Sequence, residues 1–138
     1  MSRFVIPETI KLEISQGDWL LVKRRLTAGE ERHAFARILK PTTIGEKLAL
    51  DLERTGLQKI VAYLLDWSLE DHQGRIVAVR DQPADVVERA ILDLEPSSFQ
   101  EIHAAIVAHE TAQAVALEAE KKARDGATRS SPTYTSVA

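Results

Sequence analysis

The last third of the chain holds a long stretch without a helix-breaking residue, since residues 97–124 contain neither glycine nor proline. Two overlapping capping boxes stand at its start, one pairing Ser97 with Gln100 and the other Ser98 with Glu101. Such a box satisfies backbone N–H groups that the first turn of a helix leaves unpaired. We therefore predict one helix over these residues, the longest element of the chain.

This predicted helix changes character along its length. Its first half carries Phe99, Ile102 and Ile106, which are large enough to pack on the rest of the domain, whereas after His109 the apolar residues are almost all alanine. Two series of residues recur every seven positions, which is the spacing of a coiled-coil seam. These series are Ala105, Ala112 and Ala119, and Ile102, His109, Ala116 and Ala123.

Two interpretations of this seam stay open. In one, it packs closely against a helix of another copy or of another protein. In the other, alanine is present because it is the best helix former, and the segment is a solvated extension. Alanine buries little apolar area, so at about 25 cal/mol per Å² a short seam binds weakly. The candidate partner-binding residues are Ile102, Ile106, His109, Ala112, Ala116 and Ala119.

The N-terminal part predicts a β-hairpin. Apolar residues alternate with polar ones from Ile10 to Ile14, turn residues follow at 15–18, and Trp19 begins a second strand-like run that ends at Val22. A lone hairpin is marginally stable in water, so its apolar face has to pack on the helices that follow.

Three shorter helices are predicted between the hairpin and the long helix. The first starts at a capping box of Thr27 with Glu30, carries Phe35, Ile38 and Leu39 on one side, and stops before Pro41. The second runs from about Glu53 or Leu57 to Leu65, and its apolar face contains Leu57, Ile60, Val61, Leu64 and Leu65. The third has Pro83 in its first turn, and its buried stripe contains Val86 or Val87, Ala90, Ile91 and Leu94.

Some segments remain ambiguous. Residues 47–52 fit either a strand or a helix, and Gly56 argues against one uninterrupted helix from Ile44 to Trp67. The short apolar run from Ile76 to Val79 is a candidate third strand. The predicted fold is α+β, mainly α, with an N-terminal hairpin packed on a bundle of about four helices. Residues 1–125 are expected to form a single globular domain ending in the long helix, and 126–138 a disordered polar tail.

A structural corner is predicted at Asp66 and Trp67, where the second helix meets a polar turn closed by Gly74, which can adopt positive φ. Trp67 fits a buried plug whose indole N–H needs a hydrogen-bond partner. The alternative is that Trp67 anchors a binding surface.

No catalytic or metal-binding pattern is present. The chain has no cysteine, its four histidines lack the spacing of a helical zinc site, and its six glycines are too dispersed for a phosphate-binding loop. The net charge of −3 disfavours general binding to nucleic acid, and the cluster Lys23-Arg24-Arg25 fits charges that flank a strand or helix. Neither a signal peptide at Met1–Ile10 nor a membrane span is found, so we expect a cytoplasmic, non-enzymatic protein without cofactor.

The segment from Ile60 to Gly74, which contains Asp66-Trp67-Ser68-Leu69 and then an acidic turn, resembles the tail-assembly chaperones of long-tailed bacteriophages. The flanking motifs occur in the same order: a hairpin leading to Arg24-Arg25-Leu26-Thr27-Ala28-Gly29-Glu30, and later the junction from Leu94 to Ile102. The resemblance spans roughly residues 10–108.

The resemblance implies a protein that binds the tape-measure protein in the host cytoplasm, with the tail-tube protein as a second candidate partner. It keeps the tape-measure protein soluble while tail-tube subunits assemble around it, and it is not expected in the mature virion. Members of the family are often made in two lengths by ribosomal frameshifting. The alternatives are a structural tail or neck protein retained in the virion and, in a different class, a small transcriptional or toxin-neutralising regulator.

Overall fold

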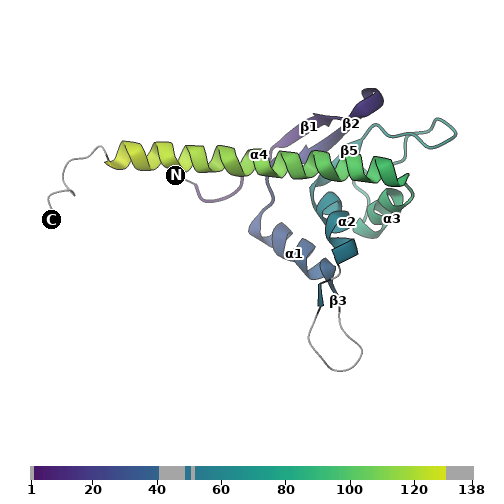
Figure 1. Ribbon diagram of the computed structural model, residues 1–138, viewed down its shortest axis with the longest axis horizontal. Helices are drawn as coiled ribbons and strands as arrows, with labels where there is room; N and C mark the ends of the chain where they lie inside the picture. The colour runs from purple at the N-terminus through teal and green to yellow at the C-terminus, as the bar shows by residue number, and fades with distance from the viewer. Residues whose placement is uncertain (1, 41–48, 51, 130–138) are drawn as a thin grey trace.

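The computed structural model describes residues 2–40, 49–50 and 52–129 (Figure 1). In chain order the elements are β1 (Thr9–Glu13), the 3₁₀ turn η1 (Ser15–Gly17), β2 (Trp19–Lys23), α1 (Ala28–Ile38), β3 (Leu39–Lys40), β4 (Ala49–Leu50), α2 (Leu52–Tyr63), β5 (Leu64–Trp67), α3 (Ala84–Leu92) and α4 (Pro96–Arg129). The predicted class is confirmed, because the described part is mainly α with an N-terminal sheet and a long C-terminal helix.

The predicted hairpin forms the first two strands of an antiparallel sheet of order β1-β2-β5. Leu12 pairs with Leu20, and Ile10 with Val22. Period-2 alternation places Leu20 and Val22 on one face of β2, and both are fully buried. The turn takes positive φ at Gln16 and Gly17.

The third strand is β5, and the prediction of a strand at 76–79 was wrong. Only a single bridge joins Glu70 to Ile76. The predicted second helix also ends earlier than expected, at Tyr63, because the next four residues form β5, which pairs with the open edge of β2. This pairing buries Leu64 and Trp67, and a register shift leaves Leu65 as an extra residue in β5.

Helix α2 runs through Gly56 without interruption. A Cβ atom at this position would come within 3.3 Å of the His103 imidazole on α4. The glycine therefore costs some helix propensity but permits the close approach of α2 to α4.

Helix α1 begins with the predicted capping box. The Glu30 N–H donates to Thr27 Oγ1 at 3.1 Å, and the Thr27 N–H donates to Glu30 Oε1 at 2.9 Å. Phe35, however, is 53% exposed and does not lie on the packing side. The half-buried residues of α1 include Ala34 and Arg37, and Arg37 forms an ion pair with Glu88 at 3.0 Å.

Helix α4 starts one residue earlier than predicted, with Pro96 in the first helical position. Both capping serines therefore lie inside the first turn, and the Phe99 N–H bonds to the Glu95 carbonyl at 3.0 Å. Pro83, expected in the first turn of α3, is instead its N-cap. At its other end α4 continues through Gly126 to Arg129, past the predicted stop near residue 124.

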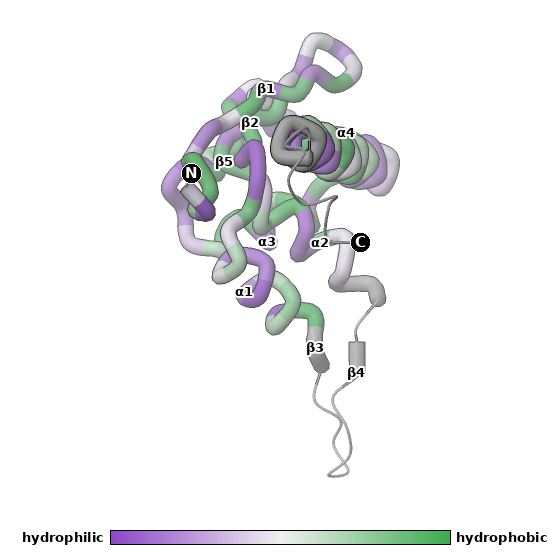
Figure 2. The backbone as a smooth tube through the Cα atoms, turned by 90° about the vertical axis from the view of Figure 1, so that its left-hand side faces the viewer, coloured by the Kyte–Doolittle hydropathy of each residue, from purple (hydrophilic) through white to green (hydrophobic). Residues whose placement is uncertain are grey.

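The core lies between the sheet and helices α2, α3 and α4, and Figure 2 looks almost along α4 with the sheet on one side of it. As predicted for the third helix, Val87 and Ile91 are buried while Val86 is 41% exposed. The buried apolar residues are Leu20, Val22, Leu57, Ile60, Tyr63, Leu64, Trp67, Val79, Val87, Ile91, Ile102 and Ile106.

A helix of 34 residues is about 51 Å long at 1.5 Å per residue, longer than a small domain is wide. The first half of α4 lies across the sheet and α2, and the second half extends past the body of the molecule (Figure 1). The expected tail at 130–138, and residues 47, 48 and 51 of the ambiguous segment, lie outside the described residues.

Candidate functional site

The corner at Trp67 is part of the core. Trp67 is 2% exposed, and its Nε1–H donates to the Val77 carbonyl at 2.7 Å. The adjacent Ser68 hydroxyl accepts the Trp19 N–H at 2.9 Å and donates to Asp18 at 3.0 Å, which ties β5 to the hairpin. Trp67 therefore offers no surface to a partner in this fold.

The loop after Trp67 is held by its own polar groups. The Asp71 carboxylate accepts the N–H groups of Gln73 at 2.8 Å and Arg75 at 3.1 Å, and these hydrogen bonds lower the pKa of Asp71. Gly74 has φ +78°, a conformation that glycine adopts without strain. Asp66 forms a long ion pair of 3.6 Å with the exposed Arg80. Asp66 and Gly74 thus shape the corner.

The six candidate partner-binding residues do not form one surface. Ile102 and Ile106 are fully buried, and His109 is 6% exposed, so these three belong to the chain's own core. Ala112 and Ala119 are exposed, and Ala116 is half-buried. The spacing of Ile102, Ile106 and His109, at i, i+4 and i+7, is the signature of an inward helix face and could have indicated this.

His109 was expected to contact a partner, and its burial within the chain has a specific cause. Its Nε2 lies 3.0 Å from the Lys23 carbonyl and 3.1 Å from the Arg24 carbonyl. Because a carbonyl can only accept, Nε2 must carry the proton and donate. His109 thereby fastens the end of β2 to the middle of α4.

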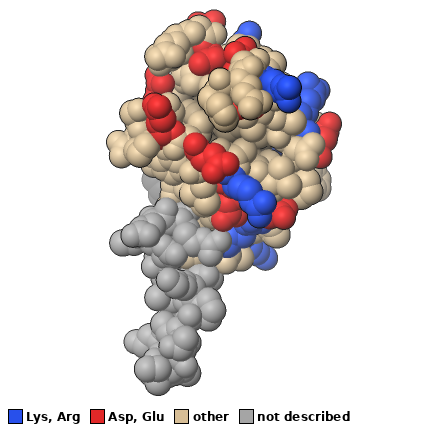
Figure 3. Space-filling model, turned by 90° about the vertical axis from the view of Figure 1, so that its right-hand side faces the viewer, with Lys and Arg blue, Asp and Glu red and all other residues tan. Residues whose placement is uncertain are grey.

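The basic cluster that follows β2 is engaged in ion pairs within the chain. Lys23 pairs with Glu30, Arg24 with Glu8 at 2.7 Å, and Arg25 with Glu120 at 3.7 Å. Burial alone would raise the pKa of Glu30, but hydrogen bonds from Lys23 and the Thr27 N–H lower it. Basic and acidic side chains are also interspersed on the face seen in Figure 3. This arrangement does not resemble the clustered positive charge that binds nucleic acid.

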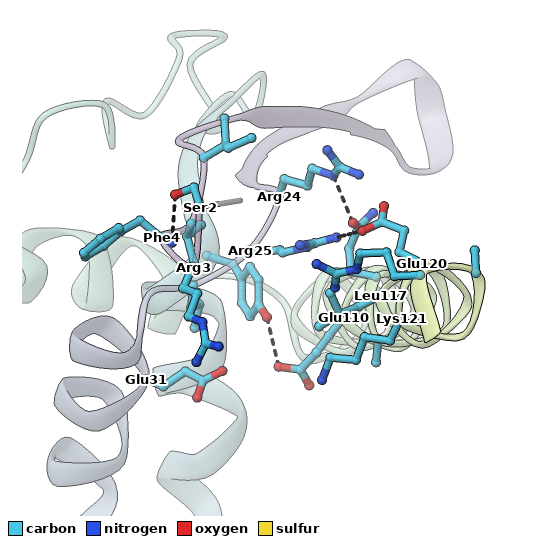
Figure 4. Close-up of a pocket in the computed structure, with 18 residues that line it drawn as sticks. Ser2, Arg3, Phe4, Arg24, Arg25, Glu31, Glu110, Leu117, Glu120 and Lys121 are labelled. Carbon is cyan, nitrogen blue, oxygen red and sulfur yellow. Dashed lines mark hydrogen bonds and ion pairs between the residues drawn. The ribbon is translucent and has the colours of Figure 1, made fainter. Parts of the chain in front are cut away.

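A groove of about 1210 Å³ lies between the N-terminal residues 2–6, the connection 24–26, and α4 from Glu110 to Arg124. We call it the α4 groove. In Figure 4, Arg24 and Arg25 reach across to α4, and Arg3 points toward Glu31 on the other side. The larger apolar residues of its lining are Phe4, Val5, Ile6, Leu26, Tyr63 and Leu117.

The wall near Glu110 is fixed by a polar cluster. The Tyr63 hydroxyl donates to Glu110 at 3.0 Å, and Lys59 pairs with the same carboxylate. Burial, together with the negative charge and hydrogen bond of Glu110, raises the pKa of Tyr63 far above its ordinary value. The hydroxyl therefore stays protonated and holds α4 to α2 at the point where α4 leaves the body.

The N-terminal wall of the groove was not singled out from the sequence. Its signal is Phe4-Val5-Ile6, three consecutive apolar residues outside any periodic element. Phe4 is 89% exposed and Ile6 66% exposed, which is unusual for side chains of this size.

Among the described residues, no group of three or more His, Cys, Asp or Glu side chains is placed to hold a metal ion. In the same part of the chain, no helix combines the length and apolar character needed to cross a membrane. Comparisons with protein-family models, with curated proteins and with solved structures found no match. The function therefore has to be inferred from the chain's own residues and surfaces.

Proposed function

We propose that this chain is a tail-assembly chaperone of a long-tailed bacteriophage. In this proposal it binds the tape-measure protein, a long helical and apolar client, and keeps it soluble until tail-tube subunits surround it. The reaction is binding without catalysis. The ordered motifs around Asp66-Trp67-Ser68-Leu69 support the family, and the shape of α4 supports the mode of action.

The observation that carries the proposal is the second half of α4, which extends past the body beside an open groove. The groove volume of about 1210 Å³ exceeds the roughly 300–1,000 Å³ of pockets that enclose small ligands. A helix lying beside an open, partly apolar groove is suited to contact another helix. Such contacts bind weakly one by one and hold a long client when many copies act together.

The proposal predicts that co-expression increases the soluble fraction of the tape-measure protein of the same phage several-fold. A truncated chain lacking residues 118–138 should lose this effect. The truncation should leave the fold intact, because the last buried residue of α4 among the described residues is His109. It removes the partner of Arg25, an exposed ion pair worth about 0–1 kcal/mol.

The measurement is the fraction of tape-measure protein in the supernatant after centrifugation, with circular dichroism of the truncated chain as the folding control. A tape-measure protein that stays insoluble beside the full chain would contradict the proposal. So would equal solubility with the full and truncated chains.

A further inference from the structure

The α4 groove carries an excess of positive charge, although the whole chain has a net charge of −3. Three acidic side chains line it, Glu31, Glu110 and Glu120. The five basic residues of the lining are Arg3, Arg24, Arg25, Lys121 and Arg124. Glu8 and Lys59 pair with lining residues from outside the groove and add one charge of each sign.

Two of these cations are distinguished by their lack of an ion pair within the part of the chain that the structure describes. Neither Arg3 nor Lys121 forms an ion pair there, and they come from opposite walls of the groove. Apolar side chains also line the groove, including Leu26 and Leu117. An occupant that matches this pattern needs an apolar stripe with acidic residues along its edges.

The walls also indicate the shape of the occupant. Ala114 and Ala123 are the small residues of α4 in the lining, so a backbone can approach the helix closely there. A helix of two or three turns presents an apolar stripe at i, i+3, i+4 and i+7 and is a common ligand of such grooves.

We propose that the α4 groove binds an amphipathic helix of another protein whose apolar stripe is flanked by Asp or Glu residues. This inference rests on the proposed chaperone function, in which such helices are segments of the client. The groove itself can be tested without the client.

The test uses two synthetic helical peptides of equal length with the same leucine stripe, flanked by glutamate in one and by lysine in the other. Binding to the full chain is measured by isothermal titration calorimetry at low and high salt. We expect the glutamate-flanked peptide to bind roughly tenfold more tightly, with the difference shrinking as salt screens the charges.

Two matched pairs of variants locate the binding surface. Ala114→Trp fills the groove, whereas Ala108→Trp changes another exposed alanine on a different face of α4, outside the lining. Lys121→Glu reverses a charge in the lining, whereas Lys122→Glu makes the same change next to it and outside the lining. The first member of each pair should weaken binding of the glutamate-flanked peptide roughly tenfold, and the second should leave it within about twofold.

Equal affinity for the two peptides, absence of binding, or equal losses within either pair would overturn the inference. Sedimentation analysis tests whether the groove instead binds a second copy of this chain. If the chain self-associates and Ala114→Trp alone abolishes the self-association, the groove binds a second copy and the inference is wrong. If the client is kept soluble but neither peptide binds, the groove inference fails while the proposed function stands. If the glutamate-flanked peptide binds but the client stays insoluble, the proposed function fails instead.

Discussion

Trp67→Ala is expected to destabilise the domain by about 3–5 kcal/mol, the usual cost of removing a buried tryptophan. Trp67 is 2% exposed and fills the space where β5, next to α2, meets the rest of the core. Single domains are stable by only about 5–15 kcal/mol, so this variant should be partly unfolded at moderate temperature. Urea unfolding followed by circular dichroism measures the change.

Trp67→Phe is the matched control for the indole N–H. The ring remains, but the hydrogen bond to the Val77 carbonyl is lost, which costs about 1 kcal/mol, with a further loss from the smaller ring. The urea concentration at the unfolding midpoint should therefore be highest for the wild type, lower for Trp67→Phe and lowest for Trp67→Ala. A Trp67→Ala variant as stable as the wild type would show that Trp67 is not part of the core.

Ile106→Ala should destabilise the domain by about 2–5 kcal/mol, because its side chain is fully buried in the core. Val115→Ala, nine residues further along α4 and 65% exposed, should change stability by no more than about 0.5 kcal/mol. Both variants remove methyl groups from a β-branched residue in the same helix, so only burial differs strongly between them.

The same urea titration measures both variants. Similar losses at the two positions would contradict the division of α4 into a docked first half and a solvated second half. That division separates the residues that stabilise the fold from those free to contact a partner.

The sequence could predict elements whose residues interact locally. The hairpin follows from alternation around a turn, and the start of α1 follows from two side chains three residues apart, Thr27 and Glu30. The long helix could be predicted because residues 97–124 contain neither glycine nor proline. In each case the deciding contacts lie within a few residues of one another.

Features that depend on distant partners were missed. Leu64 and Leu65 continue the helical pattern of α2, but they belong to β5 because this segment pairs with the open edge of β2. His109 is polar by type, and only the two carbonyls at the end of β2 explain its burial. Phe35 fits an apolar stripe, yet the Arg37–Glu88 ion pair places the neighbouring side of α1 inward.

The candidate site also depends on residues that are far apart in the chain. The six candidate partner-binding residues were expected to form one surface along the long helix, but the fold buries three of them, Ile102, Ile106 and His109. The α4 groove joins residues 2–6 to the second half of α4, more than 100 positions later in the chain. No spacing within the sequence indicates that these two segments meet.

In the proposed function, the chain acts on the tape-measure protein during assembly and then leaves. The most direct measurement is quantitative mass spectrometry of the copies of this chain per tape-measure protein, in complexes purified from infected cells and in finished particles. We predict several copies per tape-measure protein in the intracellular complexes and none in the finished particles. A constant ratio in both samples would instead identify a structural tail protein, and absence from the intracellular complexes would contradict any role as its chaperone.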